Sequence, residues 1–198
     1  MSLSVWLSFF SYTVFTALSS GPNNILALSV SGRAGIKQSR NILSGIYTGF
    51  FCVMILCGAF SAALARIIPN VIGSLKYIGA VYILWLAYHV AVSKPAEPGT
   101  SNADIVHSFW KGFFLQFVNF KIILWGITAF TGFILPYYSD VSIMISFVFL
   151  LTVIGDGATH IWAVAGTVLS GLLKKHWRTA NIGMAVILVI CAVQLVLE

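Results

Sequence analysis

The sequence predicts an all-α integral membrane protein with six transmembrane helices in a single domain, residues 1–198. Of the 198 residues, 59% are hydrophobic and 8% are charged, whereas soluble domains carry about 25% charged residues. The mean hydropathy is +0.97. A helix that crosses a bilayer needs about 20 mostly apolar residues. The chain supplies six such stretches, at about 4–30, 42–65, 71–92, 110–135, 141–165 and 179–197.

The sequence SSGPNN predicts that the first of these helices is broken near Gly21 and Pro22. Proline removes a backbone donor and clashes with the carbonyl four residues earlier, and the glycine loosens the same turn. Backbone carbonyls freed at Leu18 and its neighbours need partners inside the membrane, which the amides of Asn23 and Asn24 or a ligand can supply. A kinked helix with a local amide is the structural alternative. Two adjacent asparagines at a depth of about 12 Å favour a polar cavity.

The first helix begins with MSLSVWLSFF, which has neither the basic residues nor the cleavage site of a removable signal peptide, so we expect it to stay. In the second span, Gly45 and Gly49 are four residues apart, a spacing that lets helices pack closely. The aromatic residues of the third span predict packing and interfacial anchors. Cys52, Cys57 and Cys191 lie in apolar stretches and predict no disulfide framework.

The fourth and fifth spans carry polar residues at a depth similar to that of the break in the first. Lys121 lies about 15 Å and Asp156 about 14 Å from the membrane face at which the first span ends. An unpaired charge in hydrocarbon costs at least about 2.5 to 3.5 kcal/mol, so we expect these two residues to pair, either structurally or within a functional site. Gln116 and Asn119 extend the polar surface. His160, one turn from Asp156, is either a proton relay or a polar filler.

The basic residues predict the orientation of the chain. Eight of them flank the loops after spans 1, 3 and 5, and two lie at the opposite ends of the helices. By the positive-inside rule, the loops with more basic residues face the cytoplasm and both termini lie outside. The eight are Arg33, Lys37, Arg40, Lys94, Lys111, Lys174, Lys175 and Arg178, against Arg66 and Lys76. The net charge of +6 therefore marks topology and does not imply a nucleic-acid partner.

The sequence holds no signature of an enzyme, a cofactor or a metal site. It has no phosphate loop, no zinc-ligand spacing and no nucleophile with a base. The GDG sequence around Asp156 suggests intramembrane aspartyl proteolysis, but that chemistry needs two carboxylates inside the membrane. Asp140 lies in a loop at the opposite face, so we expect a protein that is not an enzyme.

The six-span pattern, the early GPNN and the NFK sequence at 119–121 resemble the LysE/RhtB family of bacterial amino-acid exporters. The resemblance covers essentially the whole chain. The stretches SGPNNILALS and LQFVNFKIILWGITA most resemble the family's exporters of cysteine and O-acetylserine. The chain departs from the family pattern at Phe120, where many relatives have a proline, and this weakens the expectation of a break in the fourth span. Asp156 is not part of the family motif.

The resemblance implies a carrier in the bacterial inner membrane that moves small amino acids from the cytoplasm to the periplasm, driven by the proton gradient. The predicted transport site contains Asn23, Asn24, Gln116, Asn119, Lys121 and Asp156. The half-helix that begins at Asn23 would bind the substrate carboxylate with its free amides and positive dipole end. Lys121 would hold that carboxylate, or pair with Asp156 when the site is empty, so that substrate and proton compete.

Transport would follow from rocking of the two halves, for which a 3+3 inverted repeat of spans 1–3 and 4–6 is suitable. Three alternatives remain open at this point. One is an exporter of threonine, homoserine or another amino acid. Another is a passive solute channel, and the last is a membrane scaffold in which the polar groups only hold helices together. The sequence leaves the oligomeric state undetermined.

Overall fold

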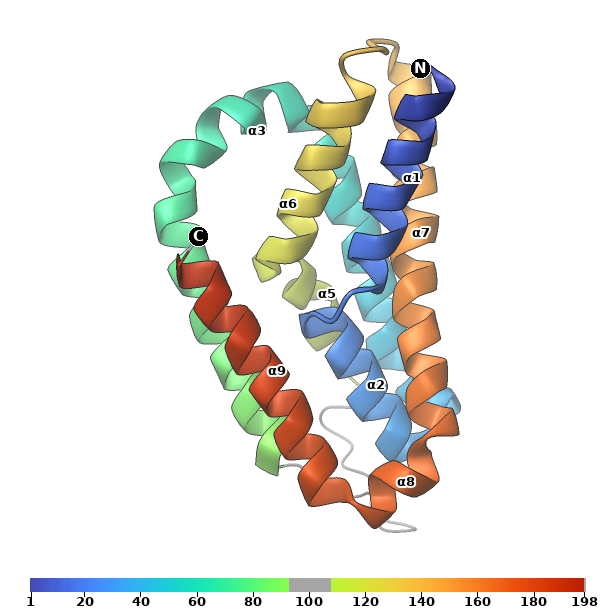
Figure 1. Cartoon of the computed structure of the whole chain (residues 1–198), viewed down its shortest axis with the longest axis vertical. Helices are drawn as coiled ribbons and strands as arrows, with labels where there is room; N and C mark the ends of the chain where they lie inside the picture. The colour runs from blue at the N-terminus through green and yellow to red at the C-terminus, as the bar shows by residue number, and fades with distance from the viewer. Residues whose placement is uncertain (93–107, 198) are drawn as a thin grey trace.

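The computed structural model describes residues 1–92 and 108–197, and its regular secondary structure within these ranges is helical. The helices run mostly along the long axis of the molecule (Figure 1). In chain order they are α1 (Leu3–Leu18), α2 (Pro22–Ala34), α3 (Ile36–Val92), α5 (Phe109–Val118), α6 (Phe120–Thr128), the π-helix η1 (Ala129–Ile134), α7 (Val141–Val168), α8 (Ser170–Lys175) and α9 (Trp177–Leu197).

Up to four passes in the described residues are long and apolar enough to cross a membrane. Two are single stretches of helix, Ile36–Ser61 within α3 and the whole of α7. Two more are bent pairs, α1 with α2 at 47° and α5 with Phe120–Ile134 at 57°. A shorter apolar helix, Trp177–Ile190, forms the start of α9. This pattern is that of a multi-pass membrane protein.

The predicted break in the first span is confirmed. Helix α1 ends at Leu18, and α2 begins at Pro22 with Gly21 as its N-cap residue. Pro22 stands in the first turn of α2, where a missing N–H costs nothing because that group has no acceptor within the helix. The proline therefore starts a second half-helix and does not merely kink one.

The fourth span is also broken, although Phe120 stands where the resemblance suggested a proline. Asn119 has extended backbone angles (φ −83°, ψ 90°) and separates α5 from α6. The fourth span therefore has the break that Phe120 had made less expected, and the inference from Phe120 was wrong. The cause lies in the side chain of Asn119, which bonds to the first span as described below.

The second and third spans were predicted as separate helices, 42–65 and 71–92, but α3 is helical from Ile36 to Val92. Figure 1 shows α3 rising through the bundle, arching over at one end and descending beside α9. The chain thus reverses by curvature where the sequence suggested a loop. Pro69 lies between the two predicted spans, and proline is a common cause of helix bending.

Glycines set the closest helix contact, between α3 and α5. A Cβ atom on Gly45 would collide with the backbone carbonyl of Phe109, and one on Gly49 would lie 2.5 Å from the carbonyl oxygen of Phe113. From the opposite side, a Cβ on Gly112 would collide with the carbonyl of Ile42. The prediction that Gly45 and Gly49 allow close packing is confirmed.

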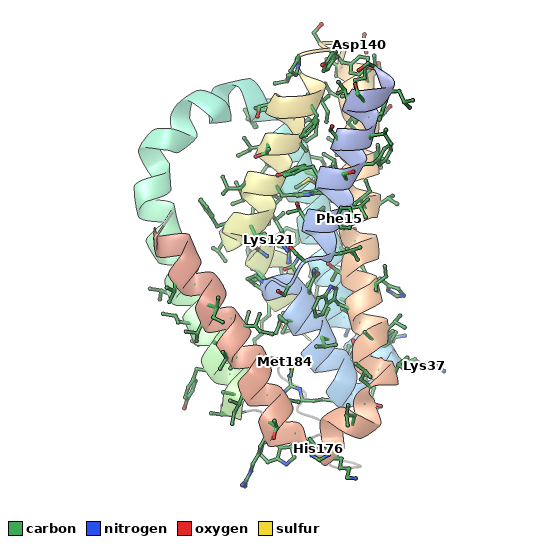
Figure 2. All side chains as sticks on the ribbon, in the orientation of Figure 1. Phe15, Lys37, Lys121, Asp140, His176 and Met184 are labelled. Carbon is green, nitrogen blue, oxygen red and sulfur yellow. The ribbon has the colours of Figure 1, made fainter. Side chains whose placement is uncertain are left out.

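The helix ends that the sequence assigns to one membrane face gather at one end of the molecule. The junction of α2 with α3, the last residues of α3 and the short helix α8 lie there (Figure 1). Figure 2 places Lys37 and His176 at this end and Asp140 at the other, near the N-terminus. The side of the membrane that this end faces stays a prediction.

Replacing Gly45 with alanine should lower stability because the added methyl group meets backbone atoms of α5 that cannot move aside. Overpacking of this kind typically costs about 1–3 kcal/mol. The thermal unfolding temperature of the protein purified in detergent measures the effect. Gly183 in α9 is the matched control, since a Cβ there meets nothing within 4 Å. Gly183→Ala should raise stability slightly, because alanine favours helix by about 1 kcal/mol. Equal effects of the two changes would contradict the packing argument.

Candidate functional site

The breaks in the first and fourth spans meet in the middle of the molecule and are tied together by three amide side chains. Asn23 Nδ2 donates to Gln116 Oε1 at 2.7 Å, and Gln116 Nε2 donates back to Asn23 Oδ1 at 2.9 Å. Asn119 Nδ2 donates to the same Asn23 oxygen at 3.2 Å. All three side chains are buried. A reciprocal amide pair of this kind holds α2 against α5 without any net charge.

The orientation of all three amides follows from one backbone contact. Gln116 Nε2 also donates to the carbonyl oxygen of Gly112 at 3.0 Å. A carbonyl only accepts, so this end of Gln116 must be its NH₂ group, and the Asn23 atom facing it must be the oxygen. Asn119 then has to present its own NH₂ to Asn23. Its oxygen Oδ1 is left enclosed without a hydrogen-bond partner.

Asn24 satisfies the carbonyls that the break sets free. Its Nδ2 donates to the carbonyl oxygens of Ala17 and Ser19, both at 2.8 Å. Its Oδ1 accepts from the Thr159 hydroxyl of α7 at 3.2 Å. The prediction that an asparagine amide caps these carbonyls holds for Asn24, whereas Asn23 turns to the fourth span.

Two tryptophans supply further donors to α1 that the sequence did not predict. Trp162 Nε1 donates to the carbonyl oxygen of Leu18 at 3.0 Å, and Trp125 Nε1 donates to that of Thr13 at 3.3 Å. The last turns of α1 are thus held by side chains from α6 and α7. An indole N–H can only donate, so Trp162 is a natural partner for the Leu18 carbonyl, which the end of α1 leaves free.

Lys121 reaches from α6 to the residues between α1 and α2. Its Nζ donates to the carbonyl oxygen of Ser19 at 2.8 Å and lies 3.5 Å from that of Ser20. Figure 2 shows Lys121 beside the junction of α1 and α2. A Cβ atom on Gly21 would lie 2.9 Å from Lys121 Cδ and 3.1 Å from Nζ. Glycine at this position therefore leaves room for the lysine side chain.

A cavity of about 360 Å³, open space at its mouth included, lies where these groups converge. Its lining comes from five helices and the α1–α2 junction. The lining residues are Thr16, Ala17, Gly21, Pro22, Asn23, Asn24, Phe50, Asn119, Lys121, Ile122, Trp125, Gly155 and Thr159. Asn23 and Asn24 both face it, together with Asn119 and Lys121, so the structure brings four of the six predicted site residues to one cavity.

The other two predicted residues lie elsewhere. Gln116 is fully buried and serves as the tie to Asn23. Asp156 does not line the cavity, and the structure, which describes both residues, places no ion pair between Asp156 and Lys121. The expected pairing is wrong because it rested on depth alone. Successive residues on a helix are turned by about 100°, so Gly155 lines the cavity and Asp156, the next residue, does not.

The apolar wall of the cavity is formed mainly by residues that the sequence did not single out. Phe50, Ile122 and Trp125 provide the large side chains. The ring of Phe50 lies directly against Gly155, where any Cβ atom would collide with it. Gly155 and Thr159 are four residues apart and lie on one face of α7. This spacing in the sequence could have indicated that both residues line the cavity.

The cavity offers an anion two kinds of donor. The backbone N–H groups of Asn23 and Asn24 belong to the first turn of α2 and have no acceptor within that helix. The positive end of the α2 dipole points the same way, and Lys121 adds a formal charge. The unpartnered Asn119 oxygen offers a cation an acceptor. The arrangement suits a small molecule that carries both charges.

Among the described residues, no cluster of three or more His, Cys, Asp or Glu side chains is placed to hold a metal ion. Cys57 is buried and Cys52 half-buried, and both are free thiols.

Comparison with known proteins assigns the chain to a family. Residues 14–198 match the family model described as LysE type translocator. The cysteine/O-acetylserine efflux protein of Escherichia coli (strain K12) is 43% identical over 188 residues, which cover 95% of each chain. The protein of the same name from Shigella sonnei (strain Ss046) matches to the same extent. No solved structure matches. With a match over nearly its whole length and relatives at this level of identity, the chain belongs to the LysE family of translocators.

Proposed function

We propose that this protein exports cysteine and O-acetylserine from the cytoplasm to the periplasm, driven by the proton gradient. The observation that carries the proposal is the cavity between the two broken spans, where the start of α2, Lys121 and Asn119 converge. The efflux proteins that are 43% identical carry these two substrates in their names. Both substrates are small zwitterions, which suits a cavity lined by donors for an anion and an acceptor for a cation.

In this proposal the substrate carboxylate binds at the start of α2. The free N–H groups of the first turn and the dipole of the half-helix favour a negative group there. Lys121 Nζ, which bonds to the Ser19 carbonyl in the structure, lies at the same place and can turn to the carboxylate. The exchange of a carbonyl for a carboxylate is favourable because bonds between charged groups are the stronger ones.

The substrate ammonium group in turn binds to Asn119 Oδ1. This oxygen is buried without a partner, and an unsatisfied buried acceptor costs about 1–3 kcal/mol. A ligand that supplies a donor removes this cost. The side chain of the substrate then lies toward Phe50, Ile122 and Trp125, where a short thiol or acetyl ester contacts apolar surface.

The proposal includes six spans in the bacterial inner membrane, with both termini in the periplasm. The broken first and fourth spans take corresponding positions in the halves of a 3+3 inverted repeat, which supports rocking of the halves around the cavity. The two bends, 47° and 57°, are of similar size.

Overproduction in a bacterium should raise cysteine and O-acetylserine in the culture medium, as measured by mass spectrometry. An uncoupler should abolish the rise, because uphill export needs the proton gradient. Export of threonine or homoserine alone would move the protein to another substrate class. Equilibration that survives the uncoupler would indicate a passive channel, and no export of any amino acid would indicate a scaffold.

Lys121→Met and Asn24→Leu should each abolish export while the protein still inserts. The first removes the charge that meets the substrate carboxylate, and the second leaves the Ala17 and Ser19 carbonyls without their amide donor. Export is measured as above, and the amount in the membrane by immunoblot. Lys111→Met is the control, since this exposed lysine in α5 lies outside the cavity. Full export by both site variants would contradict the site assignment.

Thr159→Val should weaken transport without abolishing it. The change removes the hydroxyl that donates to Asn24 Oδ1 and keeps the shape of the side chain. Loss of such a bond costs about 1–3 kcal/mol, so the substrate concentration for half-maximal transport in proteoliposomes should rise. Thr152→Val, on the same helix, removes only a bond to the Val148 carbonyl and serves as the control. An equal effect of both changes would contradict a role for Thr159 in the site.

A further inference from the structure

Asp156 is an ionisable group of a spanning helix that lies outside the cavity, and the part of the chain that the structure describes offers it no hydrogen bond. Asp156 lies in the middle of α7 and is partly buried, and its Oδ1 atom is enclosed with no hydrogen-bond partner. A carboxylate in such surroundings is costly because burial in an apolar medium takes the charge out of water. The cost is removed when the group takes up a proton and becomes a neutral carboxyl.

Two polar side chains lie close to Asp156, one from the neighbouring helix and one from the next turn of its own. Tyr47 of α3 is near enough to feel the charge of Asp156. Its hydroxyl is hydrogen-bonded to His160 Nδ1 at 3.1 Å. His160 is one turn beyond Asp156 on the same face of α7 and is exposed. A phenol and an imidazole in contact are groups that pass a proton between them.

Among the described side chains, the titratable groups of α1, α2 and α6 have other partners. The one such group of α1, Tyr12, stacks on Phe133, and the one of α2, Arg33, bonds to the carbonyl of its own Ser29 near the end of that helix. In α6, Lys121 bonds to the Ser19 carbonyl beside the cavity. Whether Asp156 is charged or neutral therefore depends on whether its carboxyl group has bound a proton.

We infer that Asp156 binds the proton that drives export, at a site separate from the substrate cavity, with Tyr47 and His160 as its route to water. The inference rests on the proposed function and deepens it. In the sequence-based expectation, proton and substrate compete for one ion pair. In this inference they bind at two neighbouring sites. One proton converts the Asp156 carboxylate to a carboxyl, and the same proton leaves toward the cytoplasm when the carboxylate forms again.

The two sites share a short wall of packed atoms. Gly155, the residue before Asp156, lines the cavity, and the ring of Phe50 lies against it. Phe50 also lines the cavity, and Tyr47 is one turn away from it on α3. A change in charge at Asp156 that moves α3 against α7 therefore moves the ring that contacts the substrate. Contiguous packing of this kind is the physical basis on which two sites couple.

The test uses purified protein in liposomes loaded with cysteine, a reductant and a trapped pH-sensitive dye. Dilution sets an outward cysteine gradient, and in the wild-type protein we expect the lumen to acidify as protons enter. Asp156→Asn, which stays neutral, should lose this acidification. It should still exchange internal cysteine for external radiolabelled cysteine. Asp156→Glu, which keeps a carboxyl, should retain the acidification.

Asp140→Asn is the matched control. Asp140 caps the start of the same helix through bonds to the backbone of Ser142 and Ile143, and asparagine caps about as well as aspartate. This variant should keep both signals. Acidification by Asp156→Asn equal to that of the wild type would overturn the inference, and so would loss of both signals, which would place Asp156 in substrate binding.

A second variant decides the matter if Asp156→Asn does not insert. Tyr47→Phe removes the hydroxyl that contacts His160 and should slow acidification while exchange continues. Unchanged acidification in Tyr47→Phe would then overturn the inference. Failure of the wild-type protein to exchange cysteine at all would instead contradict the proposed function, so the two failures are distinguishable.

Discussion

The structure depends on the need to satisfy backbone groups that are freed inside the membrane. A break in a spanning helix leaves carbonyls without donors, and hydrocarbon offers none. Here Asn24, Trp162 and Lys121 donate to the carbonyls at the end of α1. These donors come from three different helices. The break therefore fixes where α2, α6 and α7 lie, and the cavity is the space that remains between them.

The second break follows from the first. Asn119 adopts an extended backbone, and its side chain bonds to Asn23 across the interface. Gln116, one turn earlier in α5, pairs with the same residue. Close contact of α3 with α5 through Gly45 and Gly49 brings α5 near enough for these bonds. An asparagine with a fixed partner thus ends the helix here without a proline.

Much of the architecture could be predicted from local signals. Pro22 after Gly21 gave the first break, the glycine spacing gave the contact of α3 with α5, and depth brought Asn23 and Lys121 to one level. Features that depend on tertiary partners could not be predicted. The break at Asn119 needs Asn23, and the continuous helix α3 replaces an expected loop at the position of Pro69. Depth also paired Lys121 with Asp156, because counting along a helix gives height and does not give the direction in which a side chain points.

The ties between the two broken spans are amides and carbonyls, and this choice has a consequence for the proton-driven export proposed above. An amide neither gains nor loses a proton in the physiological range, so the bonds among Asn23, Gln116 and Asn119 are the same in an acidic periplasm and a neutral cytoplasm. Carboxylates and amines in their place would loosen or tighten as the pH changed on either side. The hydrogen bonds among these three amides therefore do not change with pH. A response to protons has to come from titratable groups outside this set.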